Sequence, residues 1–226
     1  MTAAAKTPVL FLSHGAPTFA IEPSLLGPLL RTLGTQLPEF KAVLVVSPHW
    51  QTQGVKVMRT ARPETVHDFG GFPSSLYALQ YPVDGAPALA NEAVRMLNAA
   101  ASLQRVMSAA KLGRALAPLR EQRVLILACG SMTHNLHDFR QSAGQPEAYA
   151  QEFTTWAQTA VRAKGVQQLI DYRAEAPHAA RAHPSEDHFL PLLVAMGATT
   201  EADGVSVLQG GIDNGALSME SYVWGA

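Results

Sequence analysis

Several histidines stand where a protein of this size could build a metal site. His14, His49 and His134 each come shortly after a short apolar run that is typical of a buried strand. His188 falls in the first turn of an expected helix, and His183 lies in the loop before it. Imidazole is the commonest metal ligand in proteins, and three or four converging imidazoles suit Zn(II) or Fe(II). The placement favours one mononuclear metal site, and the alternative is a set of unrelated loop histidines that cap turns.

Three apolar runs are expected to form the strands that position these histidines. They span residues 9–13, 42–47 and 124–129, and each is too short for a helix. Continuous apolar runs are typical of strands buried on both faces of a sheet that helices cover. In such a sheet, ligands gather beyond the carboxyl ends of the strands. The expected fold class is therefore α/β: a single domain over residues 1–226, with a central mostly parallel or mixed sheet flanked by helices and the metal site at the carboxyl ends of its strands.

The remaining elements follow from apolar periodicity. The expected helices span residues 23–35, 88–101, 102–120, 147–163, 165–172 and 185–197, and the expected closing strands span residues 204–208 and 219–224. A further strand is expected at residues 55–58, before a turn-rich loop that contains His67 and Asp68. Trp50 and Tyr81 could form the wall of an aromatic pocket, but we expect them in the core, because buried aromatic side chains usually pack there.

The composition excludes several classes of protein. Seventeen Lys and Arg oppose eighteen Asp and Glu, so the net charge of −1 provides no basic field for nucleic acid or anionic lipid. The single cysteine, Cys129, can form neither an internal disulfide nor a thiolate zinc site, which fits a reducing cytoplasm. No apolar run approaches the roughly 20 residues of a membrane span, and the first residues lack the apolar core of a signal peptide. We expect a cytoplasmic protein with no nucleic-acid or membrane partner.

Six segments of the chain form an ordered set of motifs. They are residues 11–17 (FLSHGAP), 45–50 (VVSPHW), 67–73 (HDFGGFP), 129–136 (CGSMTHNL), 183–192 (HPSEDHFLPL) and 215–222 (GALSMESY). Together they resemble the DODA-type extradiol aromatic ring-opening dioxygenases, a family in the superfamily of the protocatechuate 4,5-dioxygenase catalytic subunit. Because they occur in order and reach both ends of the chain, the resemblance is far more specific than any one motif.

The resemblance implies a role for each matched histidine. His14, His49 and His188 would hold the metal, and His134 would be the acid/base residue of ring opening or a fourth ligand. The choice of His188 over His183 comes from the family pattern, since spacing alone leaves both open. The implied cofactor is Fe(II) for catalysis, with Zn(II) as a bound or alternative metal.

The resemblance also implies where the substrate lies. In the family, the loop that corresponds to His67 and Asp68 borders the substrate pocket, so these residues would bind substrate or orient a ligand imidazole. The alternative is a plain structural turn at Gly70 and Gly71. The implied partners are a small aromatic substrate of the catechol type and O2, and the number of subunits stays open.

The chain departs from the family between Ala101 and Leu112. The family usually has an Asp-His-Gly motif with a nearby Trp there, followed by a buried strand, and this chain lacks both. We expect the loss to leave a gap or a re-paired edge in the sheet, and to remove a histidine that would face substrate or O2.

Three functions follow from these observations. The leading one is a metal-dependent extradiol ring-cleaving dioxygenase acting on a DOPA-like or related catechol with O2. One alternative is a zinc-binding protein of the same fold that has lost dioxygenase turnover. The other is a zinc hydrolase, because zinc held by histidines lowers the pKa of bound water.

Overall fold

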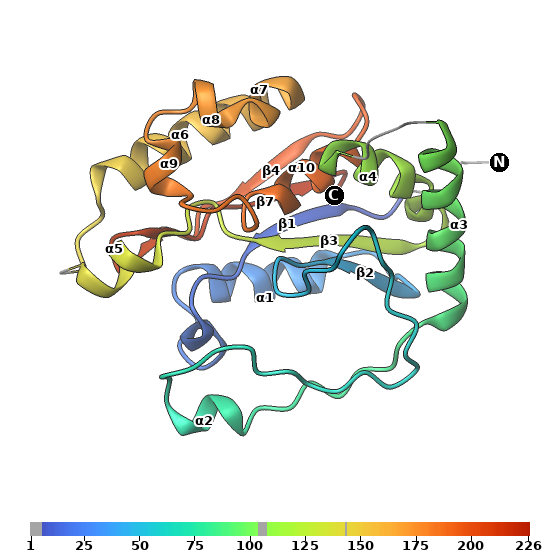
Figure 1. The fold of residues 1–226 in the computed structure, drawn as a ribbon, viewed down its shortest axis with the longest axis horizontal. Coiled ribbons are helices and arrows are strands. Elements are labelled where there is room, and N and C mark those ends of the chain that lie inside the picture. Colours follow the sequence, from blue (N-terminus) through green and yellow to red (C-terminus); the bar gives the residue numbers. More distant parts are fainter. Residues whose placement is uncertain (1–5, 104–107, 143) are drawn as a thin grey trace.

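A five-stranded mixed sheet forms the centre of the protein (Figure 1). The structure, a computed structural model, describes residues 6–103, 108–142 and 144–226. The sheet has the order β2-β3-β1-β7-β4. Its strands are β1 (Val9–Ser13), β2 (Ala42–Val46), β3 (Val124–Gly130), β4 (Val205–Leu208) and β7 (Ser221–Trp224). The first three are parallel, whereas β7 runs antiparallel to both β1 and β4. The expected α/β class with a mixed sheet is confirmed.

Helices connect and cover these strands. The α-helices are α1 (Leu26–Gln36), α2 (Ser74–Tyr77), α3 (Pro87–Leu103), α4 (Ala109–Leu116), α5 (Leu136–Gln141), α6 (Ala148–Arg162), α7 (Val166–Ile170), α8 (Tyr172–Glu175), α9 (Ala179–Ala182) and α10 (Leu190–Gly197). The 3-10 helices are η1 (Pro17–Ala20) and η2 (Ala117–Gln122), and β5 (Ile212–Asp213) pairs with β6 (Leu217–Ser218). Among the described residues, no helix combines the length and apolarity that crossing a membrane requires.

The two faces of the sheet bury unequal amounts of apolar surface. Val9 and Phe11 of β1 point into the larger cluster, to which α3, α4, α6 and α10 contribute. Leu10, between them, points the other way and packs with Leu33 of α1. This alternation is the period of two that a strand imposes on its side chains. In Figure 1, β1 and β3 lie between α1 and the helices α6 to α10.

The edge strand β2 differs from the expectation of burial on both faces. Its residues alternate between half-buried and exposed, and Val43 and Val45 are 40% and 56% exposed. The smaller cluster joins α1 to β1, β3 and β7 and contains no residue of β2. Among the described residues, no strand lies outside β2. Residues 104–107, in the region of the family's extra segment, lie outside the described residues.

Other local expectations are corrected by the structure. Residues 55–58 form no strand, because no described strand pairs with them. The helix expected from residue 185 begins only at Leu190, with Pro191 in its first turn, so His188 lies in a turn before it. Trp50 and Tyr81 are 51% and 74% exposed and are not core residues. The helix expected over 102–120 is divided into α4 and η2.

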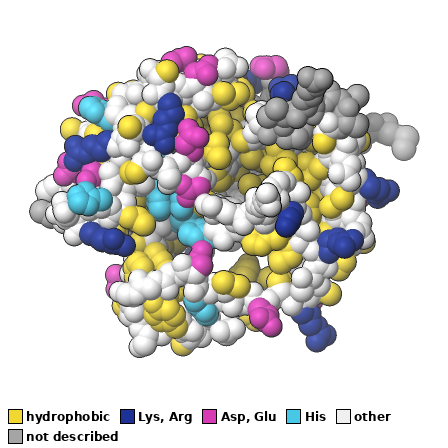
Figure 2. Space-filling view, viewed as in Figure 1, with side chains coloured by type: hydrophobic (Ala, Val, Ile, Leu, Met, Phe, Trp, Pro, Cys, Tyr) yellow, Lys and Arg dark blue, Asp and Glu magenta, His cyan; other side chains and the backbone are white. Residues whose placement is uncertain are grey.

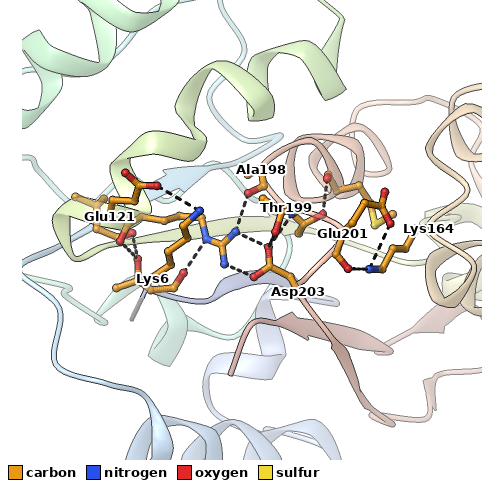
Figure 3. Close-up of polar contacts among 12 residues, drawn as sticks. Lys6, Glu121, Lys164, Ala198, Thr199, Glu201 and Asp203 are labelled. Atoms are coloured by element: carbon orange, nitrogen blue, oxygen red, sulfur yellow. Dashed lines mark hydrogen bonds and ion pairs between the residues drawn. The ribbon is translucent and has the colours of Figure 1, made fainter. Parts of the chain in front are cut away.

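A buried ion pair supports the amino-terminal end of β1 (Figure 3). The Arg120 guanidinium donates to both carboxylate oxygens of Asp203 at 2.8 Å and to the backbone carbonyl of Thr7, just before β1. The hydrogen bonds from Arg120 hold the pKa of Asp203 well below its usual range. The pair therefore joins η2, β1 and the turn before β4, far along the strands from their carboxyl ends.

Candidate metal centre

Three histidines lie together at the carboxyl ends of the strands, because β1, β2 and β3 are parallel. His14 follows β1 directly, and its backbone N–H donates to the Gly130 carbonyl at the end of β3, at 2.9 Å. His49 lies just past the end of β2, and His134 lies just past the end of β3. The sheet thus brings together residues that are far apart in the chain.

A fourth histidine, His188, reaches the same edge through backbone contacts. The N–H of Ser131 donates to the His188 carbonyl at 3.0 Å. A Cβ at position 130 would lie only 2.5 Å from that carbonyl oxygen, so the close approach requires Gly130. A second tie runs from the His134 N–H to the Ala182 carbonyl at 2.8 Å. These contacts attach the turn before α10 to the end of β3.

The side chains of His14, His49 and His188 form a compact triad. One ring nitrogen from each lies within 4.8 Å of those of the other two. The ring centroids are nearly equidistant, at 5.0 Å, 5.1 Å and 5.2 Å. Figure 2 shows histidine side chains gathered at the middle of one face, with acidic side chains beside them. This arrangement could hold one cation.

Hydrogen bonds orient all three rings in the same way. The Nδ1–H of His14 donates to the Gly15 carbonyl at 2.9 Å. The Nδ1–H of His49 donates to Asp68 Oδ2 at 2.7 Å, and the Nδ1–H of His188 donates to Asp187 Oδ2 at 2.6 Å. Because carbonyls and carboxylates only accept, each Nδ1 carries the proton and each Nε2 keeps its lone pair. The Nε2 atoms of His14 and His188 are buried and have no hydrogen-bond partner among the described residues. The triad therefore fits a metal ion that binds neutral imidazoles.

Electrostatics keep the buried rings neutral. Burial lowers the pKa of both His14 and His188 from 6.5 to about 4. Burial alone would raise the pKa of Asp187, but hydrogen bonds from Ser185 and the adjacent His188 outweigh it and leave that pKa below its usual value. The site thus pairs neutral ligands with a carboxylate that stays ionised.

His134 lies beside the triad without joining its cluster of ligand atoms. Its ring stacks on the His188 ring, with the ring centroids 3.4 Å apart and an angle of 9° between the planes. The centroids of the His134 and His14 rings are 6.4 Å apart. Burial and the neighbouring His188 lower the pKa of His134 to about 4, which is below the near-neutral value expected for a catalytic base. The ring is therefore neutral at pH 7 and able to accept a proton.

His183 is separated from the triad. Its side chain is fully buried, and its Nε2–H donates to the Met132 carbonyl at 2.9 Å. The rings of Phe153, Tyr172 and Phe189 surround it at centroid distances of 5.3 Å, 6.0 Å and 5.2 Å. The structure groups His188 rather than His183 with His14 and His49.

The two expected substrate residues have different contacts. Asp68 accepts from the Nδ1–H of His49, so it orients a triad ring. The Nε2–H of His67 donates to the Leu79 carbonyl at 3.0 Å and holds the loop together. Sequence reasoning missed Asp187 as an orienting residue, although its position directly before His188 could have indicated it.

Comparisons with known proteins agree with this fold. Residues 96–213 match the family described as the catalytic LigB subunit of aromatic ring-opening dioxygenase. The chain is 31% identical to 4,5-DOPA dioxygenase extradiol of Escherichia coli (strain K12), over 96% of this chain and 94% of that protein. It is 30% identical to the Beta vulgaris protein of the same name, over 94% of each. The crystal structure of an uncharacterized protein from Escherichia coli K12 has a TM-score of 0.69 and 25% identity, and the match covers 96% of this chain and 99% of that one.

The chain therefore belongs to the family of the catalytic LigB subunit of aromatic ring-opening dioxygenases. The match with the Escherichia coli relative extends over 255 residues, whereas this chain has only 226. That relative consequently contains residues with no counterpart in this chain.

Proposed function

We propose that this protein is a metal-dependent extradiol dioxygenase that opens a catechol-type ring beside its hydroxyl pair with O2. The observation that carries the proposal is the convergence of three imidazoles whose Nε2 lone pairs are free, two of them buried without a partner. Membership of a family of aromatic ring-opening dioxygenases supports the reaction class. The names of the relatives, 4,5-DOPA dioxygenase extradiol, support a catechol such as DOPA or a related compound.

In this proposal His14, His49 and His188 hold Fe(II), with Zn(II) as an alternative occupant. When bound, the ion supplies a Lewis-acidic centre at which catechol and O2 can meet. Three neutral ligands on one side leave neighbouring coordination positions open, whereas an all-thiolate cage would close the site. Asp68 and Asp187 keep the His49 and His188 rings aimed at the ion.

We assign proton transfer to His134. The ring is neutral at pH 7, so its lone pair can accept a proton from a catechol hydroxyl; the lowered pKa makes it a weaker base, which favours return of the proton as the ring opens. The stack on His188 places it beside the triad without occupying a ligand position. The loop that carries His67 and Asp68 forms the substrate side of the site.

Oxygen uptake tests the proposal directly. Protein loaded with Fe(II) under anaerobic conditions should consume O2 when a catechol is added, and a yellow ring-opened product should accumulate. His134→Gln should bind the metal normally and lose most turnover. His178→Asn is the matched control, because His178 is exposed, pairs with Glu152 and has a left-handed backbone that Asn tolerates. Metal-loaded protein that consumes no O2 across a panel of catechols would contradict the proposal.

A second candidate is a metal-binding protein that has lost turnover. The observation that favours it is the extra length of the relatives, because the expected missing segment carries a histidine near the site. It predicts tight zinc binding with no O2 uptake. A zinc hydrolase would instead cleave esters or amides in a reaction that a chelator abolishes.

A further inference from the structure

An apolar pocket lies between η1 and residues 65–81. Its volume is about 340 Å³, and its walls include Pro17, Phe69, Leu76, Leu79 and Tyr81. The ring of Phe69 is packed against those of Tyr77, Phe72 and His67 at centroid distances of 5.0 Å, 5.6 Å and 5.8 Å. These contacts hold Phe69 in place, so the pocket has at least one preformed wall.

Both walls are attached to the histidine triad. Pro17 begins η1 three residues after His14, and Asp68, which adjoins His67 and Phe69, accepts from His49 Nδ1–H. His49 is the exposed member of the triad, so the site is open on its side. The loop that forms one wall of the pocket is therefore bonded directly to a ring of the triad.

The polar groups of the pocket are largely used by the loop itself. The His67 Nε2–H donates to the Leu79 carbonyl, and Thr65 Oγ1 accepts from the Tyr81 N–H at 2.9 Å. None of the described residues that line the pocket is Lys, Arg, Asp or Glu. Arg59 lies in the connection between β2 and α3, and its side chain donates to Asn91 Oδ1 of α3. In Figure 1, α3 lies on the opposite side of the molecule from α2.

We infer that this site selects catechols whose ring carries an uncharged apolar substituent, an alkyl or aryl group, which the pocket of Phe69, Leu76, Leu79 and Tyr81 receives. The inference rests on the proposed function. Removal of apolar surface from water lowers the free energy, whereas a carboxylate would lose part of its hydration here without meeting a Lys or Arg among the described lining residues. The preference therefore differs from that of an enzyme built for the charged side chain of DOPA.

Binding and turnover of one substrate series test the inference separately. Titration calorimetry on Zn(II)-loaded protein should show affinity rising about three- to fourfold for each carbon from catechol to 4-methylcatechol to 4-ethylcatechol. We expect 3,4-dihydroxybenzoate and DOPA to bind at least about tenfold more weakly than 4-ethylcatechol. An oxygen electrode with the Fe(II) protein should give the same order in kcat/KM.

A charge placed in the pocket should reverse the order. Leu79 is 41% exposed, and its carbonyl, which His67 uses, survives substitution. Leu79→Arg should improve 3,4-dihydroxybenzoate and weaken 4-ethylcatechol. Ile170→Arg, which adds the same charge to a similarly exposed apolar position on α7, should leave the series unchanged.

Each outcome separates the inference from the proposed function. Tighter or equal binding of the charged catechols overturns the inference, and O2 uptake would then leave the proposed function standing. The expected binding order without O2 uptake supports the inference about the pocket and overturns the proposed dioxygenase activity. Failure of every catechol to bind overturns both.

Discussion

His183 and His188 lie five residues apart and are both buried, yet their environments are opposite. The ring of His183 is enclosed by three aromatic rings and bonded to a backbone carbonyl. The ring of His188 contacts three other imidazoles, those of His14, His49 and His134, and a carboxylate. Each has one ring nitrogen without a partner, so neither burial nor an unpaired nitrogen marks a metal ligand. The distinguishing feature is the convergence of other ligand atoms on the same point.

The largest expected effect is on metal binding at His188. In His188→Ala, the affinity for Zn(II) or Fe(II) should fall by more than about 100-fold, because a ligand is removed rather than merely reoriented. The metal content of the purified protein and a competitive zinc titration measure the change. Full metal retention would show that His188 is not a ligand.

The corresponding change at His183 should affect folding instead. His183→Ala empties a packed aromatic site and leaves the Met132 carbonyl without its donor, so the metal-free protein should lose about 3 kcal/mol of unfolding free energy. Urea denaturation measures the loss. The folded variant should still bind one metal ion per chain, and loss of the metal with stability unchanged would reverse our assignment of the two histidines.

A smaller effect is expected from the carboxylate that distinguishes His188. Asp187→Asn weakens the acceptor of the Nδ1–H, so metal affinity should fall about 10- to 100-fold without abolishing binding. Glu152→Gln, which weakens the exposed pair with His178, is the control and should change nothing in the zinc titration. Equal affinity in wild type and Asp187→Asn would mean that the carboxylate does not support the ligand.

The smallest effect concerns pH. Burial lowers the pKa of His183 to about 3, so below about pH 6.5 the unfolded chain binds a proton that the folded protein excludes. The free energy of unfolding of the metal-free protein should therefore keep its full contribution from His183 above about pH 6.5, and lose it progressively as the pH falls toward 3. In His183→Gln the decline should be shallower by up to about 1.4 kcal/mol per pH unit. Urea denaturation at pH 7, 6 and 5 measures both slopes, which should differ.

Local patterns predicted the central strands well. The bounds of β1, β2 and β3 agree with the expected runs to within one residue, because an apolar run bounded by Gly or Pro is a local signal. The same runs indicated that His14, His49 and His134 would lie together at the carboxyl ends of the strands. Parallel strands make that outcome a consequence of topology rather than of any detail of packing.

Local patterns failed where a neighbouring element decides the structure. Residues 55–58 have the composition of a strand, but they have no partner strand among the described residues. Val43 and Val45 are exposed because they lie on β2, an edge strand that contributes no residue to the cluster containing α1. Tyr81 is exposed because its loop lines a pocket instead of packing into the core.

By itself, the sequence determined the class of fold and the edge of the sheet at which chemistry is expected, because strand periodicity and the ends of strands are local properties. Spacing along the chain left His183 and His188 both open and the family resemblance favoured His188, but the tertiary structure brings His188 to His14 and His49. That choice depends on the close approach of the His188 carbonyl to Gly130 and on the aromatic rings around His183. The proton positions on the triad were likewise decided by Gly15, Asp68 and Asp187, whose acceptor oxygens meet the rings only in the folded chain.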